Sequence, residues 1–208
     1  MNFVVGRHSQ ANANRLILGI FERSDGTIPF FTSDELAHYD NALLATYGVR
    51  KEFPRTGKRG RPQKPMLVAP RNLIYAQVVK HREKGRVVEV STRVVFGTAK
   101  AVEARLEQSS VSRVINTSFV ERNNLTMRHQ NRRLVRKTIA FSKEQERLRR
   151  QLHLSFAYYH FVKPHLGLQQ RSRSRKHKYQ ERTPMMAAGI TDHIWSMQEL
   201  FSLIVLES

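Results

Sequence analysis

The chain has 208 residues, with 36 Lys and Arg against 17 Asp and Glu, and its formal net charge is +19. Hydrophobic residues make up 40% of it, which is enough to bury a core, and the absence of cysteine excludes disulfides, thiolate metal sites and cysteine nucleophiles. The chain contains no apolar run of about eighteen residues, so no membrane-spanning helix is predicted. The first ten residues lack the pattern of a secretory signal. We therefore expect a soluble, cytoplasmic protein whose positive charge binds a polyanion, most simply nucleic acid.

The positive charge lies mainly in two blocks. Residues 50–86 carry a net charge of +10 and residues 122–182 carry +14, whereas residues 87–121 between them are neutral. Two nucleic-acid-facing surfaces on a folded core would give this distribution, and so would two solvated runs of charge.

The N-terminal quarter begins with an apolar run at residues 2–6 that could form a short strand. Apolar spacing then predicts a helix over residues 11–23, a buried strand over 28–33 and a second helix over 36–47. Asp34 would lie between the end of a strand and the start of a helix, where open α/β sheets usually place their functional groups.

The middle of the chain begins with residues 50–72, which contain four prolines, show no periodicity and are predicted to form an exposed basic loop. Two strands are expected over residues 73–79 and 87–96, joined by a hairpin turn at 83–86. Thr98 is expected to cap a short helix that ends at Leu106.

The C-terminal part is predicted to be helical. A long helix is expected from Ser118 to about Thr138, and Ser142 with Gln145 forms a capping-box pattern for a further helix that ends before Pro164. Residues 171–178 are a basic low-complexity patch, after which residues 183–189 and 194–204 are expected to form two short helices. An α/β beginning with a helical end predicts one mixed-sheet domain.

Glu121 is the only acidic residue between Glu107 and Glu144, and arginines flank it. On a helix it shares a face with Asn124 and Arg128, because offsets of three and seven residues return to the same side. A carboxylate beside cations could hold Mg²⁺ next to a phosphodiester. Alternatively, Ser118 and Glu121 form a capping box in which the glutamate satisfies only the backbone.

Asp34 also has two interpretations. An aspartate at a strand end can ligate a metal, or it can stabilise the N-terminus of the following helix through the macrodipole. Asp34 and Glu121 together would fit two-metal phosphoryl transfer, which usually needs a third carboxylate. No acidic residue lies N-terminal to Glu22.

Several segments match one known family. They are Thr32-Ser33-Asp34-Glu35 with Tyr39, Ala42 and Leu43, the block from Asn116 to Lys143, Tyr158-Tyr159-His160-Phe161, and residues 183–195. They resemble the insertion-sequence-one-like group of bacterial insertion-sequence transposases of the DDE class, and the resemblance runs from about Val4 to Trp195.

The resemblance implies an α/β fold, an RNase H-like mixed sheet with flanking helices, incomplete at the N-terminus and followed by a helical C-terminal part. The partial DDE catalytic domain would span residues 1–163, with a basic loop insertion at 50–72, and residues 164–208 would be a basic linker and a C-terminal helical tail. The implied activity is metal-dependent DNA cleavage and strand transfer of an insertion sequence, with Mg²⁺ or Mn²⁺ as cofactor. The implied partner is DNA, both the element ends and the target, which a homo-oligomer of the chain would bind. The implied location is the cytoplasm of a bacterium or archaeon, in association with the nucleoid.

Site residues follow from the resemblance by position. Asp34 corresponds to the second acidic catalytic residue and Glu121 to the third, and both would bind the metal. DNA contacts are expected from Arg122, Asn124, Arg128, Arg132, Arg133, Arg136 and Lys137, and from Lys58, Arg59 and Arg61 in the basic loop.

One departure from the family concerns the first aspartate. In the family it lies on a strand shortly before the segment that matches residues 3–7, and this chain begins there. We therefore expect the chain alone to lack a complete two-metal site and to be inactive, although it could still bind DNA. The alternative is a non-catalytic basic nucleic-acid-binding protein in which Asp34 and Glu121 are purely structural.

Overall fold

The computed structural model describes residues 2–53, 64–109, 112–135, 137–172 and 178–205, with no side-chain detail for residues 203–205. The chain forms two compact units, a first unit of residues 2–123 and a second unit that begins at Asn124. The division predicted at residues 163 and 164 lies inside the second unit.

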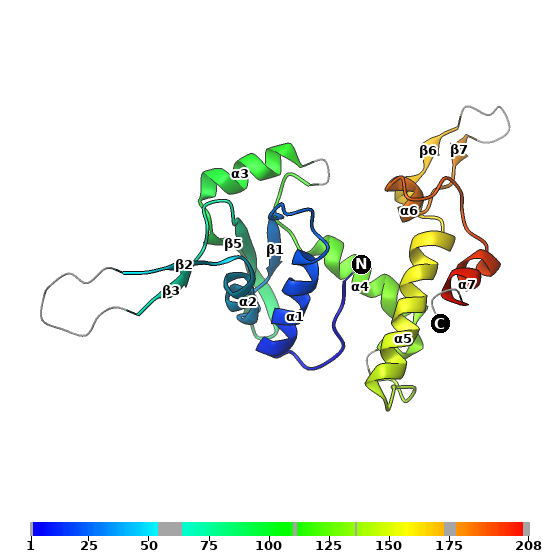
Figure 1. The fold of residues 1–208 in the computed structure, drawn as a ribbon, viewed down its shortest axis with the longest axis horizontal. Helices are drawn as coiled ribbons and strands as arrows, with labels where there is room; N and C mark the ends of the chain where they lie inside the picture. Colours follow the sequence, from blue (N-terminus) through cyan, green and yellow to red (C-terminus); the bar gives the residue numbers. More distant parts are fainter. Residues whose placement is uncertain (1, 54–63, 110–111, 136, 173–177, 206–208) are drawn as a thin grey trace, which may run out of the picture. The chain divides into compact units, whose positions relative to one another are not determined.

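A three-stranded mixed sheet forms the centre of the first unit (Figure 1). Its strands are β1 (Phe31–Asp34), β4 (Tyr75–Glu83) and β5 (Arg86–Phe96), in the spatial order β1-β4-β5. Strand β1 is parallel to β4, with Phe31 opposite Tyr75 and Asp34 opposite Val78. Strand β5 runs antiparallel to β4.

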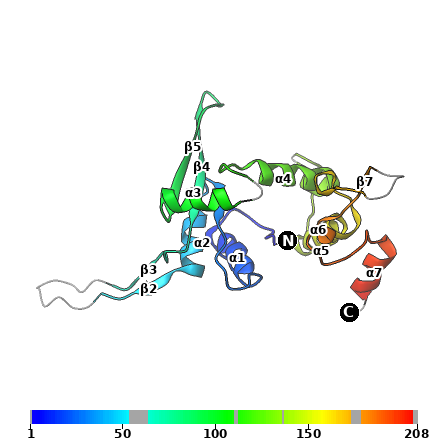
Figure 2. The same cartoon turned by 90° about the horizontal axis from the view of Figure 1, so that it is seen from above.

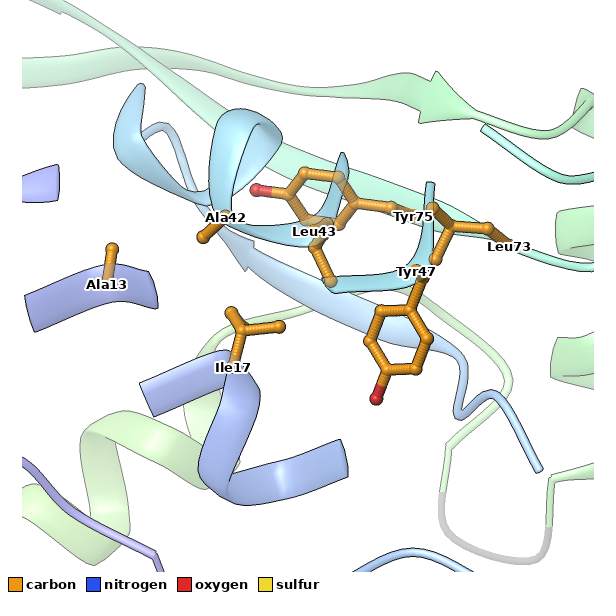
Figure 3. Close-up of a cluster of buried hydrophobic side chains, with 7 residues drawn as sticks. All are labelled: Ala13, Ile17, Ala42, Leu43, Tyr47, Leu73 and Tyr75. Atoms are coloured by element: carbon orange, nitrogen blue, oxygen red, sulfur yellow. The ribbon is translucent and has the colours of Figure 1, made fainter. Parts of the chain in front are cut away.

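Helices cover both faces of this sheet. Helices α1 (Gln10–Phe21) and α2 (His38–Tyr47) pack on one face, and their apolar side chains meet those of the sheet in the cluster drawn in Figure 3. A second cluster on the opposite face joins Ile74 and Ala76 to Val102 of α3 (Ala99–Gln108). The two clusters divide because successive residues of β4 point to opposite faces. The first cluster consists of Ala13, Ile17, Ala42, Leu43, Tyr47, Leu73 and Tyr75.

The β4–β5 hairpin confirms the turn predicted at residues 83–86. Lys84 and Gly85 both have positive φ, 47° and 80°, which a two-residue hairpin turn of the primed type requires. Figure 2 shows the far end of the hairpin projecting beyond α3. The predicted cap of α3 is also confirmed, since Thr98 Oγ1 accepts a hydrogen bond of 3.2 Å from the Ala101 N–H.

Two predictions for the first unit are wrong. Residues 2–6 form no strand; instead, Asn2 Nδ2 donates to the Leu16 carbonyl at 2.7 Å and fastens an irregular segment to α1. The segment 50–72 is not simply a loop, because strands β2 (Val49–Lys51) and β3 (Met66–Val68) pair antiparallel at its two ends. Pairing between segments so far apart leaves no local periodicity to read. Residues 54–63 lie outside the described residues.

Helix α4 (Ser118–Gln130) crosses from the first unit into the second. The helix predicted to reach Thr138 ends at Gln130, because Asn131 has extended backbone angles and its Oδ1 accepts from the Arg133 N–H at 3.0 Å. That side-chain bond starts a separate 3₁₀ turn, η1 (Arg132–Leu134).

The rest of the second unit is made of short elements. The helix predicted to begin at Ser142 begins at Gln145, since Ser142 Oγ donates to the Glu144 carbonyl at 2.9 Å and caps no helix. The cap predicted at Thr183 is confirmed, and Pro184 follows it at the first helical position. The elements are α5 (Gln145–Ala157), the π-helix η2 (Tyr158–Val162), the 3₁₀ helix η3 (Leu166–Leu168), the paired strands β6 (Gln170–Arg171) and β7 (Tyr179–Gln180), and helices α6 (Pro184–Ala187) and α7 (Met197–Val205).

The described part of the chain is thus a mixed α/β structure with a small sheet and two further strand pairs. Its helices are all too short or too polar to cross a membrane, so far as the described residues extend. The basic patch predicted at residues 171–178 falls largely on residues 173–177, which lie outside the description.

Candidate functional site

Asp34 is the last residue of β1 and is exposed. It does not cap the next helix, because α2 begins at His38 after Ala37 and has no side-chain cap. Within the described residues its carboxylate has no hydrogen bond or ion pair. Its negative charge adds to burial in raising the pKa of the nearby Tyr39 hydroxyl. Asp34 therefore presents a free carboxylate at the carboxyl end of a sheet strand.

Glu121 lies in the first turn of α4, and its carboxylate is held by two side chains. Its Oε1 accepts hydrogen bonds from Lys80 Nζ at 2.7 Å and from Thr117 Oγ1 at 2.8 Å. The bond from Lys80 is the largest cause that lowers the pKa of Glu121, and the bond from Thr117 is the next. Glu121 is therefore ionised at neutral pH while its side chain stays largely exposed.

The capping box proposed for Ser118 and Glu121 does not form. Ser118 is the first residue of α4 and its Oγ donates to Asn116 Oδ1 at 2.5 Å, while the Glu121 N–H donates to the Thr117 carbonyl at 2.9 Å. The glutamate side chain thus bonds to Lys80 and to the Thr117 hydroxyl rather than to the backbone at the helix start.

Strand β4 links the two carboxylates. Asp34 stands opposite Val78 in the parallel β1–β4 pair, and residues opposite one another project from the same face. Lys80 follows Val78 by two residues, so it also projects from this face, just beyond the end of β1. Because Lys80 binds Glu121, the structure places Asp34 and the Lys80–Glu121 ion pair on one face and at one end of the sheet.

A chain of hydrogen bonds supports the backbone at Asp34 from the opposite face. Gln77 Nε2 donates to Tyr75 Oη at 2.7 Å, Tyr75 Oη lies 2.7 Å from Ser33 Oγ, and Ser33 Oγ donates to the Asp34 carbonyl at 2.6 Å. Since Ser33 already donates its proton to that carbonyl, Tyr75 is the donor to Ser33. Burial raises the pKa of Tyr75 and so keeps that proton in place.

The residues predicted to contact DNA are divided between the two units. Arg122 belongs to the first unit, and Arg128 in the second unit is half-buried. Lys58, Arg59, Arg61 and Arg136 lie outside the described residues. The exposed ones are Arg122, Asn124, Arg132, Arg133 and Lys137.

Sequence reasoning missed the side chains that organise the site. Lys80 lies in the basic block of residues 50–86, directly after the strand expected over residues 73–79, and nothing in that pattern singles it out as the partner of Glu121. Thr117 precedes Glu121 by four residues, a spacing that brings two side chains together at a helix start. Gln77 gave no signal, because two of its three side-chain partners, Asp40 and Arg93, come from other elements of the fold.

The chemistry of the site suits a hard cation. Asp34 and Glu121 offer carboxylate oxygens, the ligands that Mg²⁺ and Mn²⁺ prefer. Glu121 already binds one cation, the ammonium of Lys80. Among the described residues no group of three or more His, Asp or Glu side chains is arranged to hold an ion.

Comparison of the chain with protein-family models, with curated proteins and with solved structures finds no match.

Proposed function

We propose that this chain carries part of the RNase H-like catalytic domain of a DDE transposase, which cuts DNA at the ends of a mobile element and joins it to a target. The observation that supports the proposal is the position of Asp34 on the same face and at the same end of the sheet as the Lys80–Glu121 pair. A strand that ends at an aspartate, on the sheet face that also carries a bound glutamate from a helix, suits the resemblance seen in the sequence.

The proposed chemistry has two steps. Water attacks the phosphorus at the element's 3′ end, so a new P–O bond forms and the bond to the 3′ oxygen breaks, leaving a free 3′-OH. That hydroxyl then attacks a phosphorus of the target, where a new P–O bond forms and the target's own 3′ oxygen leaves. Mg²⁺ or Mn²⁺, when bound, activates the nucleophile and stabilises the leaving oxygen.

The chain's own residues prepare these steps. Asp34 and Glu121 would hold the metal, and Lys80 keeps Glu121 ionised until the ion arrives. The bonds from Gln77 through Tyr75 and Ser33 fix the backbone that carries Asp34. Exposed arginines neutralise DNA phosphates and would make binding strongly dependent on salt.

Metal binding tests the site in the chain as it exists. Mn²⁺ titration followed by electron paramagnetic resonance should show one or more bound ions, and Asp34→Asn and Glu121→Gln should each weaken binding about tenfold or more. Glu103→Gln is the matched control, because Glu103 is exposed on α3. Binding that survives both site substitutions would refute the metal assignment.

Cleavage tests the activity. Because the resemblance places the first aspartate before residue 3, the assay uses the chain extended by the codons upstream of Met1, with Mg²⁺ and DNA that carries the element ends. Nicking should depend on Mg²⁺ and should disappear in Glu121→Gln. Nicking that persists in that variant would show that Glu121 has no catalytic role.

One observation favours a second candidate, a non-catalytic nucleic-acid-binding protein. Glu121 is held within the protein by Lys80 and Thr117, which is what a purely structural carboxylate would show. In that case Glu121→Gln would leave Mn²⁺ binding unchanged, whereas for the transposase we expect it to weaken Mn²⁺ binding. The melting temperature should change little in either case, since an exposed ion pair contributes only about 0–1 kcal/mol to stability.

A further inference from the structure

Strand β5 has an open outer edge. Among the described residues it pairs only with β4, and it stands at the end of the sheet order β1-β4-β5. Residues 86–93 are exposed, including Val88 and Val90, which are 54% and 60% exposed. An edge of this length is a template for another strand unless charge, proline or a bulge protects it.

The sequence of this edge is self-complementary about Ser91. Reading outward from Ser91 in both directions, Val90 matches Thr92 and Glu89 matches Arg93. The next two matches, at Val88 with Val94 and at Val87 with Val95, are valine with valine. In an antiparallel pair of identical strands centred on Ser91, each Glu89 would therefore face an Arg93.

We propose that β5 pairs antiparallel with β5 of a second copy of this chain, with the two Ser91 residues opposite each other on a two-fold axis. The two three-stranded sheets would then join into one of six strands. Such an interface uses the same surface on both copies, as a closed two-fold dimer requires. This inference goes beyond the proposed function and does not depend on it.

The ladder between β4 and β5 selects this register. Its pairing is regular from Glu89 to Val94 and shifts at both ends, opposite the His81/Arg82 step and opposite the Tyr75/Ala76 step. The straight part of the edge is thus the segment that contains Glu89, Ser91 and Arg93. Sliding the partner by one residue places Glu89 opposite Thr92 or Val94 and loses both ion pairs.

The charged residues on either side of Ser91 support the same pairing. The Glu89 carboxylate has no ion pair within the described residues, so it is available to a partner. Arg93 supplies the opposite charge on the same strand; its guanidinium lies over β4, where Nη2 donates to Gln77 Oε1 at 2.5 Å and Nη1 lies 3.7 Å from Glu35 Oε1, and in the proposed dimer it would turn outward to the partner's Glu89. Opposite charges across a strand pair stabilise it, and β-branched pairs such as Val90 with Thr92 do so as well.

A cysteine cross-link tests the register, because the native chain has no cysteine. Ser91→Cys should give a disulfide-linked dimer under mild oxidation, since Cα atoms of directly opposite residues lie about 4.5–5.5 Å apart, within disulfide range. Thr92→Cys is the matched control, because its two copies would be diagonal neighbours about 7–8 Å apart. Equal cross-linking of the two variants, or none in either, would overturn the proposed register.

A charge exchange tests the interface without any covalent bond. Sedimentation at about 0.15 M salt should show a concentration-dependent dimer, and Glu89→Arg should weaken it about tenfold or more by placing arginines opposite each other. Arg93→Glu should also weaken self-association, whereas a mixture of Glu89→Arg and Arg93→Glu chains should form a heterodimer with both ion pairs restored. Glu103→Arg on α3 is the control for the same charge change.

The outcomes separate cleanly. A wild-type chain that stays monomeric at every concentration would refute the proposal, and so would a dimer that is equally stable in Glu89→Arg. Circular dichroism checks that each variant is folded. If Arg93→Glu unfolds because it loses Gln77, the Ser91→Cys and Thr92→Cys pair still decides the register.

Discussion

The two units carry nearly the same net charge but differ in the number of apolar side chains that each buries in its interior. Residues 2–123 have a net charge of +9 and residues 124–208 have +10, which together make the +19 of the chain. Among the described residues, eleven of the buried hydrophobic side chains lie in the first unit and only three in the second, at Met127, Leu152 and Leu200. The same basic character is thus placed on two very different cores.

This difference indicates which interactions stabilise each unit. The first unit buries apolar side chains on both faces of a sheet, so the hydrophobic effect acts on many residues at once. Among the described residues the second unit buries three apolar side chains and two polar ones, Asn131 and Thr183, whose side chains accept hydrogen bonds from backbone N–H groups. Local hydrogen bonds therefore contribute a larger share of the stability of the second unit than of the first.

The largest expected effect comes from the core of the first unit. Leu43 is 1% exposed and lies in the main cluster, so Leu43→Ala should lower the free energy of unfolding by about 2–5 kcal/mol, from lost burial and the cavity left behind. Leu152→Ala in the second unit should cost less, because Leu152 belongs to neither of the two buried apolar clusters of the described residues. Urea unfolding followed by circular dichroism measures both, and an equal loss would remove the contrast between the units.

The next effect concerns the buried polar side chain behind Asp34. Gln77 is fully buried and contacts Tyr75, Asp40 and Arg93, so Gln77→Leu would remove one hydrogen bond from each of these groups. We expect a loss of about 1–3 kcal/mol in the free energy of unfolding, measured in the same urea experiment. Asp40→Asn is the control, since an amide oxygen still accepts the bond from Gln77, and it should change stability by much less.

Sequence reasoning predicted the elements that local signals encode. The turn at Lys84 and Gly85, the cap at Thr98 and the cap with proline at Thr183 and Pro184 all depend on residues a few positions apart, and all are confirmed. Ser142 shows the limit of such signals. Its hydroxyl donates to the Glu144 carbonyl and accepts from no helix N–H among the described residues, so the same pattern did not start a helix.

The arrangement of the site could not be predicted, because it depends on long-range pairing. Asp34 meets Val78 through strands 44 positions apart, and Lys80 meets Glu121 across 41 positions. The sequence did single out Asp34 and Glu121 as carboxylates of interest. It did not reveal that Lys80 would bind Glu121, since that contact exists only after β4 and α4 have come together.

A smaller effect is expected for nucleic-acid binding, which both units could support through their charge. If Arg132 of the second unit contacts a phosphate, Arg132→Ala should reduce the slope of log affinity against log salt by about one and weaken binding equally for all sequences. Arg82 in the first unit is an exposed comparison on the far end of the hairpin. Fluorescence anisotropy with duplex DNA over a range of salt concentrations measures both, and a larger change in Arg82→Ala would place the contact surface on the first unit instead.

The smallest expected effect is a pH dependence confined to the second unit. His193 Nδ1 lies 2.6 Å from Asp192 Oδ1 and its Nε2 lies 2.9 Å from Glu199 Oε1, and the bond to Asp192 is the first cause that raises the pKa of His193 above 6.5. Hydrogen bonds from Ser196 and His193 lower the pKa of Glu199 from 4.5 to about 2. The histidine contribution is thus fully present below pH 6.5 and is lost as the pH rises through its raised pKa. The glutamate contribution is present above pH 4.5 and is lost as the pH falls towards 2.

Residues 191–199 should therefore be most stable between about pH 4.5 and 6.5, a window set by these two groups. Thermal melting followed by the fluorescence of Trp195, the only tryptophan, reports on this segment. The midpoint should fall slightly from pH 6.5 to 8 in the native chain and should stay level in His193→Gln, because the substituted side chain does not titrate. The change must be small because these side chains are exposed, and about 1 M salt should reduce it further. An equal fall in the native chain and in His193→Gln would assign the pH dependence to groups other than His193. The pH dependence would then no longer distinguish the second unit from the first.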